Sequence, residues 1–333
     1  MSPARALGIK RQVKGGVVST CMRVLAVDGG GIRGLIPLTV LEYVERRTGR
    51  PASQLFDLMV GVSTGAVIVL GLATRGLGGG PLYGAKDIAR FYEQESHLIF
   101  RRRVLPFIRN LFEAKYSPDR LEQVLSHIFG EGRLSQTSGH VVIPAYDIER
   151  DEPYLFDSRR ARLDPQNEDF LVRDVARAAS AAPTYFPPVR LARTARDGYL
   201  ALVDGGVFAN NPALIGYVEA MSLRPAAQIL LVSLGTGESF EPILLKDARG
   251  WGLAKWAQPI LSIAFDGGGR MVHRQLEALL PEDRYFRFQA ELPSGIALDR
   301  VQGDSTRRLR LHGERVVARE RSRLERLCAL LSS

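Results

Sequence analysis

A serine flanked by glycines stands where a predicted strand gives way to a predicted helix. Residues 61–65 read Gly-Val-Ser-Thr-Gly, between the apolar run 57–62 and the apolar segment 64–74. A serine nucleophile must be held out on a tight strand-to-helix turn, and the two glycines would let such a turn close without Cβ clashes. The pattern therefore predicts a nucleophilic Ser63. The alternative is an ordinary helix start that is rich in serine and glycine.

A second glycine-rich segment, residues 28–34, reads Asp-Gly-Gly-Gly-Ile-Arg-Gly and matches the Gly-x-Gly-x-x-Gly pattern of dinucleotide-binding turns. A dinucleotide site would need an acidic residue at the end of the next strand, but Glu42 and Glu45 fall on the intervening predicted helix. The alternative is an oxyanion hole, because consecutive glycine N–H groups can point at one spot and Arg33 adds positive charge. Since the carboxyl ends of parallel strands meet at one edge, this loop and the serine turn can share a crevice. We therefore favour an oxyanion region formed by Gly29, Gly30, Gly31 and Arg33.

A serine hydroxyl is a weak nucleophile and needs a general base. Four of the five histidines lie in predicted helices or at a strand start, at positions 97, 127, 140 and 312. The fifth, His273, follows the glycine-rich segment 266–270, which predicts a turn. Asp204 is the better candidate, because burial at the end of the apolar run 200–203 can raise a carboxyl pKa enough to accept the serine proton. The alternative is a glycine turn with a capping aspartate.

These loops need a scaffold, and the surrounding pattern predicts one. Short apolar runs are typical of buried strands, and longer segments with apolar residues at helical spacing are typical of helices. In chain order we expect a strand at 23–28, a helix at 36–48, a strand at 57–62, a helix at 64–74, and strands at 140–146, 200–203 and 228–234. This alternation predicts an α/β fold, a three-layer α/β/α domain around a largely parallel sheet, over residues 22–333.

Three further segments are expected to add to this domain. Residues 1–21 are basic and contain no acid, which predicts an N-terminal arm that is either disordered or in contact with a membrane. The polar region 78–139 predicts a helical insertion or cap over the sheet edge, with helices at 87–100 and 118–129. A basic helix is predicted at 305–331, with an apolar stripe that either packs on the domain or lies on a membrane.

The composition limits the class of protein. The 333 residues include 45 Lys and Arg against 36 Asp and Glu, a formal charge of +9, which suits an anionic partner such as a membrane surface, a nucleic acid or a nucleotide. The arginines at 101–103 are either a solvated helix end or a phosphate contact. Cys21 and Cys328 cannot form a disulfide framework or a thiolate metal cluster, which favours a reducing compartment. With no secretory signal and no apolar stretch of the ~20 residues that a bilayer needs, we expect a cytoplasmic protein with peripheral membrane contact.

Taken in order, residues 28–34, 61–65 and 204–206 resemble the three signature blocks of the patatin-like phospholipases, in particular bacterial ones. The segments 180–188, 210–212 and 233–237 also resemble that family, and the likeness covers about residues 22–240. The resemblance implies Ser63 as the nucleophile, Asp204 as the other half of a Ser–Asp dyad, and no catalytic histidine, metal or cofactor. It also implies an oxyanion region at Gly29, Gly30, Gly31 and Arg33, and motif glycines at Gly34, Gly61, Gly65, Gly205 and Gly206. The glycine run after Asp266 matches no block of the family.

The expected function is hydrolysis of carboxylic ester bonds in glycerophospholipids or lysophospholipids, through an acyl-enzyme, at an anionic membrane and without a nucleic-acid partner. One alternative keeps this hydrolase but makes it an effector activated by a cyclic nucleotide in anti-phage signalling, as some bacterial patatin-like enzymes of similar size are. The arginine surplus would suit such an anionic activator. The other alternative is a nucleotide-binding module that uses the loop at Gly29 and performs no ester chemistry.

Overall fold

The computed structural model describes residues 21–99, 114–193, 198–239, 242–293, 298–299 and 304–333. The predicted arm at 1–21 and the arginines at 101–103 therefore lie outside the described residues, apart from Cys21. Within the described part of the chain, no helix combines the length and apolar content needed to cross a membrane.

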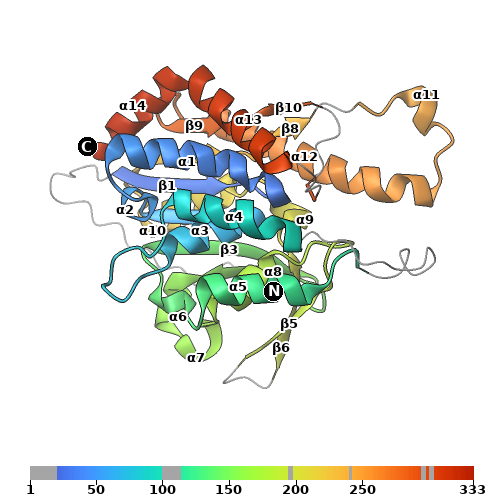
Figure 1. Cartoon of the computed structure of the whole chain (residues 1–333), viewed down its shortest axis with the longest axis horizontal. Coiled ribbons are helices and arrows are strands. Elements are labelled where there is room, and N and C mark those ends of the chain that lie inside the picture. Colours follow the sequence, from blue (N-terminus) through green and yellow to red (C-terminus); the bar gives the residue numbers. More distant parts are fainter. Residues whose placement is uncertain (1–20, 100–113, 194–197, 240–241, 294–297, 300–303) are drawn as a thin grey trace, which may run out of the picture.

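An eight-stranded mixed sheet lies at the centre of the fold (Figure 1). Its strands follow the order β5-β6-β3-β2-β1-β7-β9, with β4 paired to β3. Strands β3, β2, β1, β7 and β9 are parallel to one another, whereas β4 and β6 run antiparallel to β3, and β5 runs antiparallel to β6. The bounds are β1 Cys21–Val27, β2 Leu58–Gly61, β3 His140–Asp147, β4 Glu152–Asp157, β5 Val189–Ala192, β6 Tyr199–Asp204, β7 Gln228–Leu234 and β9 Tyr285–Phe288. A separate two-stranded sheet pairs β8 (Glu238–Ser239) with β10 (Glu291–Leu292).

Helices cover both faces of this sheet. Alternate residues of β1 point to opposite faces, so that Val24 and Ala26 join a core cluster with α10, and Leu25 and Val27 join the larger cluster with α1 and α3. The predicted three-layer α/β/α architecture with a mostly parallel sheet is therefore confirmed. The helices are α1 Leu35–Thr48, α2 Ala52–Leu55, α3 Thr64–Ala73, α4 Ala85–Ile99, α5 Pro118–Phe129, α6 Ser158–Leu163, α7 Pro165–Glu168, α8 Val172–Ala179, α9 Gly206–Ala209, α10 Ala213–Leu223, α11 Leu245–Ala248, α12 Leu253–Leu279, α13 Ser305–Arg319 and α14 Arg321–Ser332, with 3-10 turns η1 Gly31–Gly34 and η3 Leu134–Gln136.

The region 78–139 contains the two predicted helices, as α4 and α5. Helix α4 packs against α1 and α3, and α5 packs against α4 and α8. Both therefore lie against helices on one face of the sheet, and the insertion or cap expected over residues 78–139 stays a prediction.

The single basic helix predicted at 305–331 is in fact two helices, α13 and α14, which are separated at Glu320. Both pack against α1. A continuous helix of that length would span about 40 Å, but α1 spans only about 21 Å, so the chain must turn to keep both apolar stripes on it. Leu309, Val316, Leu324 and Leu327 are buried there, which confirms that the stripe packs on the domain.

The turn predicted at residues 266–270 is also wrong, because these glycines lie inside the long helix α12. A glycine in a helix interior costs about 1 kcal/mol relative to alanine, so the intrinsic preference opposes this helix. Packing outweighs it, since Leu276 is buried and Val272 lies against the same core cluster as α10.

Candidate active site

Ser63 occupies a strained backbone position between β2 and α3, with φ 54° and ψ −123°. A non-glycine residue in this region costs of order 1–3 kcal/mol, and such strain is concentrated at functional sites. The flanking glycines are required by close contacts. A Cβ on Gly61 would lie 2.2 Å from the Gly65 carbonyl oxygen, and a Cβ on Gly65 would lie 2.1 Å from the Val27 carbonyl oxygen. The turn therefore forms only with glycine on both sides of the serine.

Asp204 reaches Ser63 because of how three strands share β3. Strand β4 pairs along one edge of β3, so β2 and β6 must occupy the other edge, β2 at residues 140–142 and β6 at residues 145–147. Since β6 is antiparallel to β2, its last residue runs toward the turn that follows β2. A Cβ on Gly205 would lie 2.5 Å from the Pro144 carbonyl oxygen, which shows how closely the chain passes β3 after Asp204.

The Asp204 carboxyl is almost completely buried, with 3% of the residue exposed. Burial raises its pKa to about 6, against the opposing effects of a side-chain hydrogen bond from Ser63 and a backbone hydrogen bond from Gly206. The Gly206 N–H donates to Oδ1 over 2.8 Å. A buried carboxyl with a pKa raised to about 6, lining the same cavity as a serine hydroxyl, has the protonation behaviour of a general base.

The glycine loop lies opposite this pair. The Gly29 N–H donates to the Asn210 carbonyl oxygen over 3.0 Å, and the Gly29 carbonyl accepts from the Thr236 hydroxyl over 2.6 Å. This corrects one prediction, since the Gly29 N–H is already used and cannot also bind an oxyanion. Among the described residues, the N–H groups of Gly30 and Gly31 have no hydrogen-bond acceptor. Gly31 has φ 55°, a left-handed conformation that favours glycine.

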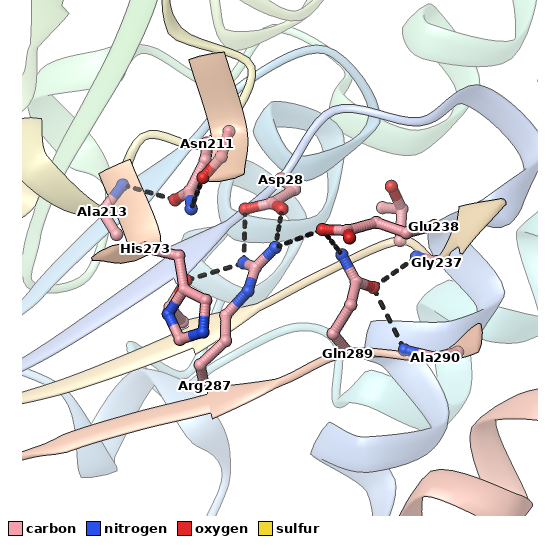
Figure 2. A network of polar contacts seen from close by, with 12 residues as sticks. Asp28, Asn211, Ala213, Gly237, Glu238, His273, Arg287, Gln289 and Ala290 are labelled. Carbon is pink, nitrogen blue, oxygen red and sulfur yellow. Dashed lines mark hydrogen bonds and ion pairs between the residues drawn. The ribbon is translucent and has the colours of Figure 1, made fainter. Parts of the chain in front are cut away.

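An ion pair from strand β9, which lies beyond β7 in the sheet, fixes the base of this loop. Arg287 donates from Nη1 to Asp28 Oδ1 over 3.0 Å and from Nη2 to Asp28 Oδ2 over 2.6 Å, and both residues are buried. Arg287 also donates to the Ser233 hydroxyl over 2.8 Å and lies 4.0 Å from Glu238 (Figure 2). A buried bidentate pair of this kind holds a planar geometry, so it fixes Asp28 at the point where β1 turns into the glycine loop.

Ser63 and Asp204 line one cavity of about 660 Å³ together with the glycine loop. On one side its wall is apolar and comes from α4 and α5, with Ile88, Phe91, Leu121, Leu125 and Ile128 among the lining residues. An aliphatic chain could therefore be buried beside the serine hydroxyl.

Similarity to known proteins identifies the family of this chain. The sequence profile described as patatin-like phospholipase matches residues 25–217. The chain is 33% identical over 311 residues to patatin-like protein 1 of Arabidopsis thaliana, covering 82% of this chain and 75% of that protein. It is 31% identical over 342 residues to patatin-like protein 1 of Oryza sativa subsp. indica, covering 90% of this chain and 82% of that protein. The chain belongs to the patatin-like phospholipase family. The matched residues 25–217 include the glycine loop, the serine turn and Asp204.

In this patatin-like chain the predicted site residues fall into two groups. Those that line the cavity are Gly29, Gly30, Gly31, Arg33, Ser63, Asp204 and Gly206. Those that shape the backbone around it without lining it are Gly34, Gly61, Gly65 and Gly205. The Arg33 guanidinium donates from Nη1 to the Gly237 carbonyl oxygen over 3.4 Å, so its charge lies beside the glycine loop.

His273 is not placed to serve as a base. It lies on α12, its Nδ1 is 3.1 Å from the Tyr285 hydroxyl, and it is not among the residues that line the cavity. Within the described residues, no group of three or more His, Cys, Asp or Glu side chains could hold a metal ion.

Two contributors to the site were not found by sequence reasoning. Arg287 is 259 residues from Asp28 along the chain, and nothing in its local sequence signals the pairing. Tyr92 on α4 is partly buried in the cavity wall and donates from its hydroxyl to the Thr64 carbonyl oxygen over 3.2 Å. That bond ties the insertion to the first turn of the helix behind Ser63, and only the packing of α4 on α3 reveals it.

Proposed function

We propose that this protein hydrolyses carboxylic ester bonds of glycerophospholipids or lysophospholipids through a Ser63–Asp204 dyad. Family membership supports a lipid hydrolase. The observation that carries the finer proposal is a strained serine that lines the same cavity as a buried carboxyl whose pKa is raised to about 6, beside an apolar wall. The apolar wall of the cavity would bind the acyl chain of the substrate, and the dyad would cleave the ester bond.

In the proposed first step the Asp204 carboxylate takes the Ser63 proton while the serine oxygen attacks the ester carbonyl carbon. The tetrahedral intermediate collapses to an acyl-enzyme, and Asp204 gives its proton to the departing alcohol of the lysolipid or glycerol backbone. In the second step Asp204 takes a proton from water, which attacks the acyl carbon. Ser63 recovers its proton, and the fatty acid leaves.

The oxyanion of both intermediates is assigned to the N–H groups of Gly30 and Gly31. They are the members of the loop without an acceptor among the described residues, and the side chain of Arg33 lies beside them. Each well-placed donor can lower the barrier by about 3 kcal/mol. Gly29 serves a different purpose in this scheme, because its two backbone bonds to Asn210 and Thr236 hold the loop in place.

A fluorophosphonate probe and a defined phospholipid test the proposal together. We expect the parent chain to be labelled on Ser63 and to release free fatty acid, as detected by mass spectrometry. Ser63→Ala should show neither property, and Asp204→Asn should lose most of both. Ser222→Ala is the matched control, because Ser222 is exposed on α10 away from the cavity. Fatty-acid release by Ser63→Ala at the parent rate would refute the assignment.

The remaining expectations stay predictions. The relatives reported above are plant proteins, so a bacterial subgroup is untested. Activation by a cyclic nucleotide is also untested, and vesicle assays with and without a panel of cyclic nucleotides would decide it. The nucleotide-binding alternative is less well supported than the hydrolase, because the loop lines the same cavity as Ser63 and an apolar wall. A chain that binds nucleotide but is never labelled by the probe would reverse that preference.

A further inference from the structure

Residues 242–265, which we call the apolar arm, include α11 and the first half of α12. Figure 1 shows α11 and the start of α12 extending away from the body of the molecule. Five large aliphatic side chains of the arm are exposed, by 37% to 71% of their area: Ile243, Leu244, Leu245, Ile260 and Ile263. Single exposed apolar residues are ordinary, but five within 21 residues indicate a surface that binds something.

The arm also carries the other side chains typical of a membrane interface. Trp251 and Trp256 stand edge to face with their ring centroids 5.3 Å apart, and both are only partly buried. Indole rings are favoured at the level of lipid headgroups, since their apolar body and polar N–H suit that region. Three exposed cations, Lys246, Arg249 and Lys255, accompany one acid, Asp247. The resulting charge suits an anionic surface.

The arm is continuous with the cavity that contains the reactive serine. Pro242, Ile243, Pro259, Ile263 and Phe265 line the same cavity as Ser63. A hydrophobic chain that left a bilayer along this surface could therefore enter the cavity without crossing water. A protein partner on the arm would cover this opening, so continuity with the cavity favours a lipid surface as the occupant.

The basic C-terminal helices do not offer an equivalent surface. The apolar stripe of α13 and α14 is buried against α1, where Leu309, Val316 and Leu324 are each at most 2% exposed. Their arginines can add positive charge, but the apolar area that would enter a bilayer is already used in the core. The arm, by contrast, keeps five large aliphatic side chains exposed beside the cavity.

We propose that the apolar arm docks the protein on an anionic lipid bilayer. Its aliphatic and indole side chains enter the boundary between headgroups and acyl chains, and Lys246, Arg249 and Lys255 face the lipid phosphates. The part that concerns delivery of an acyl chain to Ser63 rests on the proposed function. The docking itself does not require catalysis.

Vesicle flotation of the full chain in a Ser63→Ala background tests docking without turnover. The vesicles are phosphatidylglycerol with phosphatidylcholine, or phosphatidylcholine alone. We expect Leu245→Asp combined with Ile260→Asp to weaken binding to the anionic vesicles by about tenfold or more. Neither residue lines the cavity. The matched control is Leu163→Asp at the end of α6, where the side chain is also exposed, by 75%. The control should bind as the parent does.

A second pair of variants tests the charge. Lys246→Glu combined with Arg249→Glu should lower binding to anionic vesicles and reduce its dependence on salt, and Lys86→Glu on α4 should change neither. Docking through the arm is overturned if the parent does not bind the anionic vesicles, or if the arm variants bind as well as Leu163→Asp does. It is equally overturned if the arm variants instead lose self-association while vesicle binding is kept.

Hydrolysis of a soluble short-chain ester, with Ser63 restored, separates this inference from the proposed function. We expect the Leu245→Asp and Ile260→Asp variant to hydrolyse p-nitrophenyl butyrate at the parent rate, which also shows that it is folded, while its rate on anionic vesicles falls. If no variant hydrolyses any ester but vesicle binding still depends on the arm, the proposed function fails and the docking stands. If soluble and vesicle rates fall together, the arm acts on the dyad and the docking fails.

Discussion

Replacing Asp204 by asparagine should stabilise the protein while removing its activity. The carboxylate is buried, and its pKa is raised from 3.8 to about 6 chiefly by loss of solvation. A raised carboxyl pKa means that the folded state holds the proton more tightly than the unfolded state does. The ionised form therefore destabilises the fold. Asparagine keeps an acceptor for the Gly206 N–H and carries no charge, so it removes this cost.

The size and the pH range of the effect follow from the two pKa values. Below about pH 4 the carboxyl is protonated in both states, and its ionisation costs nothing. Between about pH 4 and pH 6 the unfolded chain ionises first, so the stability of the parent falls. Above about pH 6 the loss reaches its full value of about 3 kcal/mol. The free-energy difference between Asp204→Asn and the parent should grow over that interval and then level off.

Urea unfolding of both proteins at pH values from 4 to 8 measures that difference. The other ionisable groups contribute equally to the unfolding free energies of the two proteins, so their contributions cancel. Asp247→Asn is the matched control, because Asp247 is exposed on α11. The rate of ester hydrolysis by the parent should rise with pH through about 6, as the proposed base loses its proton. Asp204→Asn should hydrolyse the ester 10²-fold or more slowly than the parent, as expected on removal of a general base. A difference in unfolding free energy that does not change between pH 4 and pH 8 would refute the argument that Asp204 is desolvated and held ready as a base.

Three further substitutions test the frame around the dyad. Gly65→Ala should lower the free energy of unfolding by about 1–3 kcal/mol in urea denaturation and lower the rate of ester hydrolysis by about 10²-fold. Gly267→Ala, in open space on α12, should instead raise the free energy of unfolding by about 0.5–1 kcal/mol. If both alanines had the same effect, the close contacts at the turn would not matter. Ser63→Gly should unfold at a higher free energy than Ser63→Ala by about 1 kcal/mol, because glycine relieves the strained φ; the opposite order would show an unstrained turn. Arg287→Met should lower the free energy of unfolding by about 3–5 kcal/mol, because it leaves the Asp28 carboxylate buried without its partner. Adding Asp28→Asn should recover part of this loss. If the effects of the two substitutions in urea unfolding were simply additive, that would argue against the ion pair.

Much of the scaffold could be predicted because the relevant signals are local. The apolar run before Ser63 and the glycines beside it describe a strand, a turn and a helix within 18 residues, 57–74, and the structure has β2 and α3 there. The helix at residues 36–48 also ends as expected, with Gly49 at φ 68° in the left-handed conformation. These features depend on residues that are neighbours in the sequence, so the pattern contains them.

The errors have a common physical origin in contacts between distant segments. The glycines at 267–269 favour a turn by intrinsic preference, but the packing of Leu276 and Val272 on the core keeps the helix intact. The break at Glu320 depends on the length of α1, which lies some 270 residues earlier in the chain. Neither outcome is encoded in the periodicity of the segment itself.

Only part of the arrangement of Asp204 and Ser63 can be predicted from local sequence. The sequence predicts that the loops after β1 and β2 share one crevice, because those strands are parallel, and that Asp204 lies at the end of a strand. It does not indicate that β6 is antiparallel and pairs with the part of the same β3 edge, residues 145–147, that lies beyond the residues paired with β2. That topology is what removes the carboxyl from water and points it at the serine. The same burial that destabilises the ionised carboxylate is therefore what raises its pKa to about 6, so the proposed base and its cost in stability have one cause.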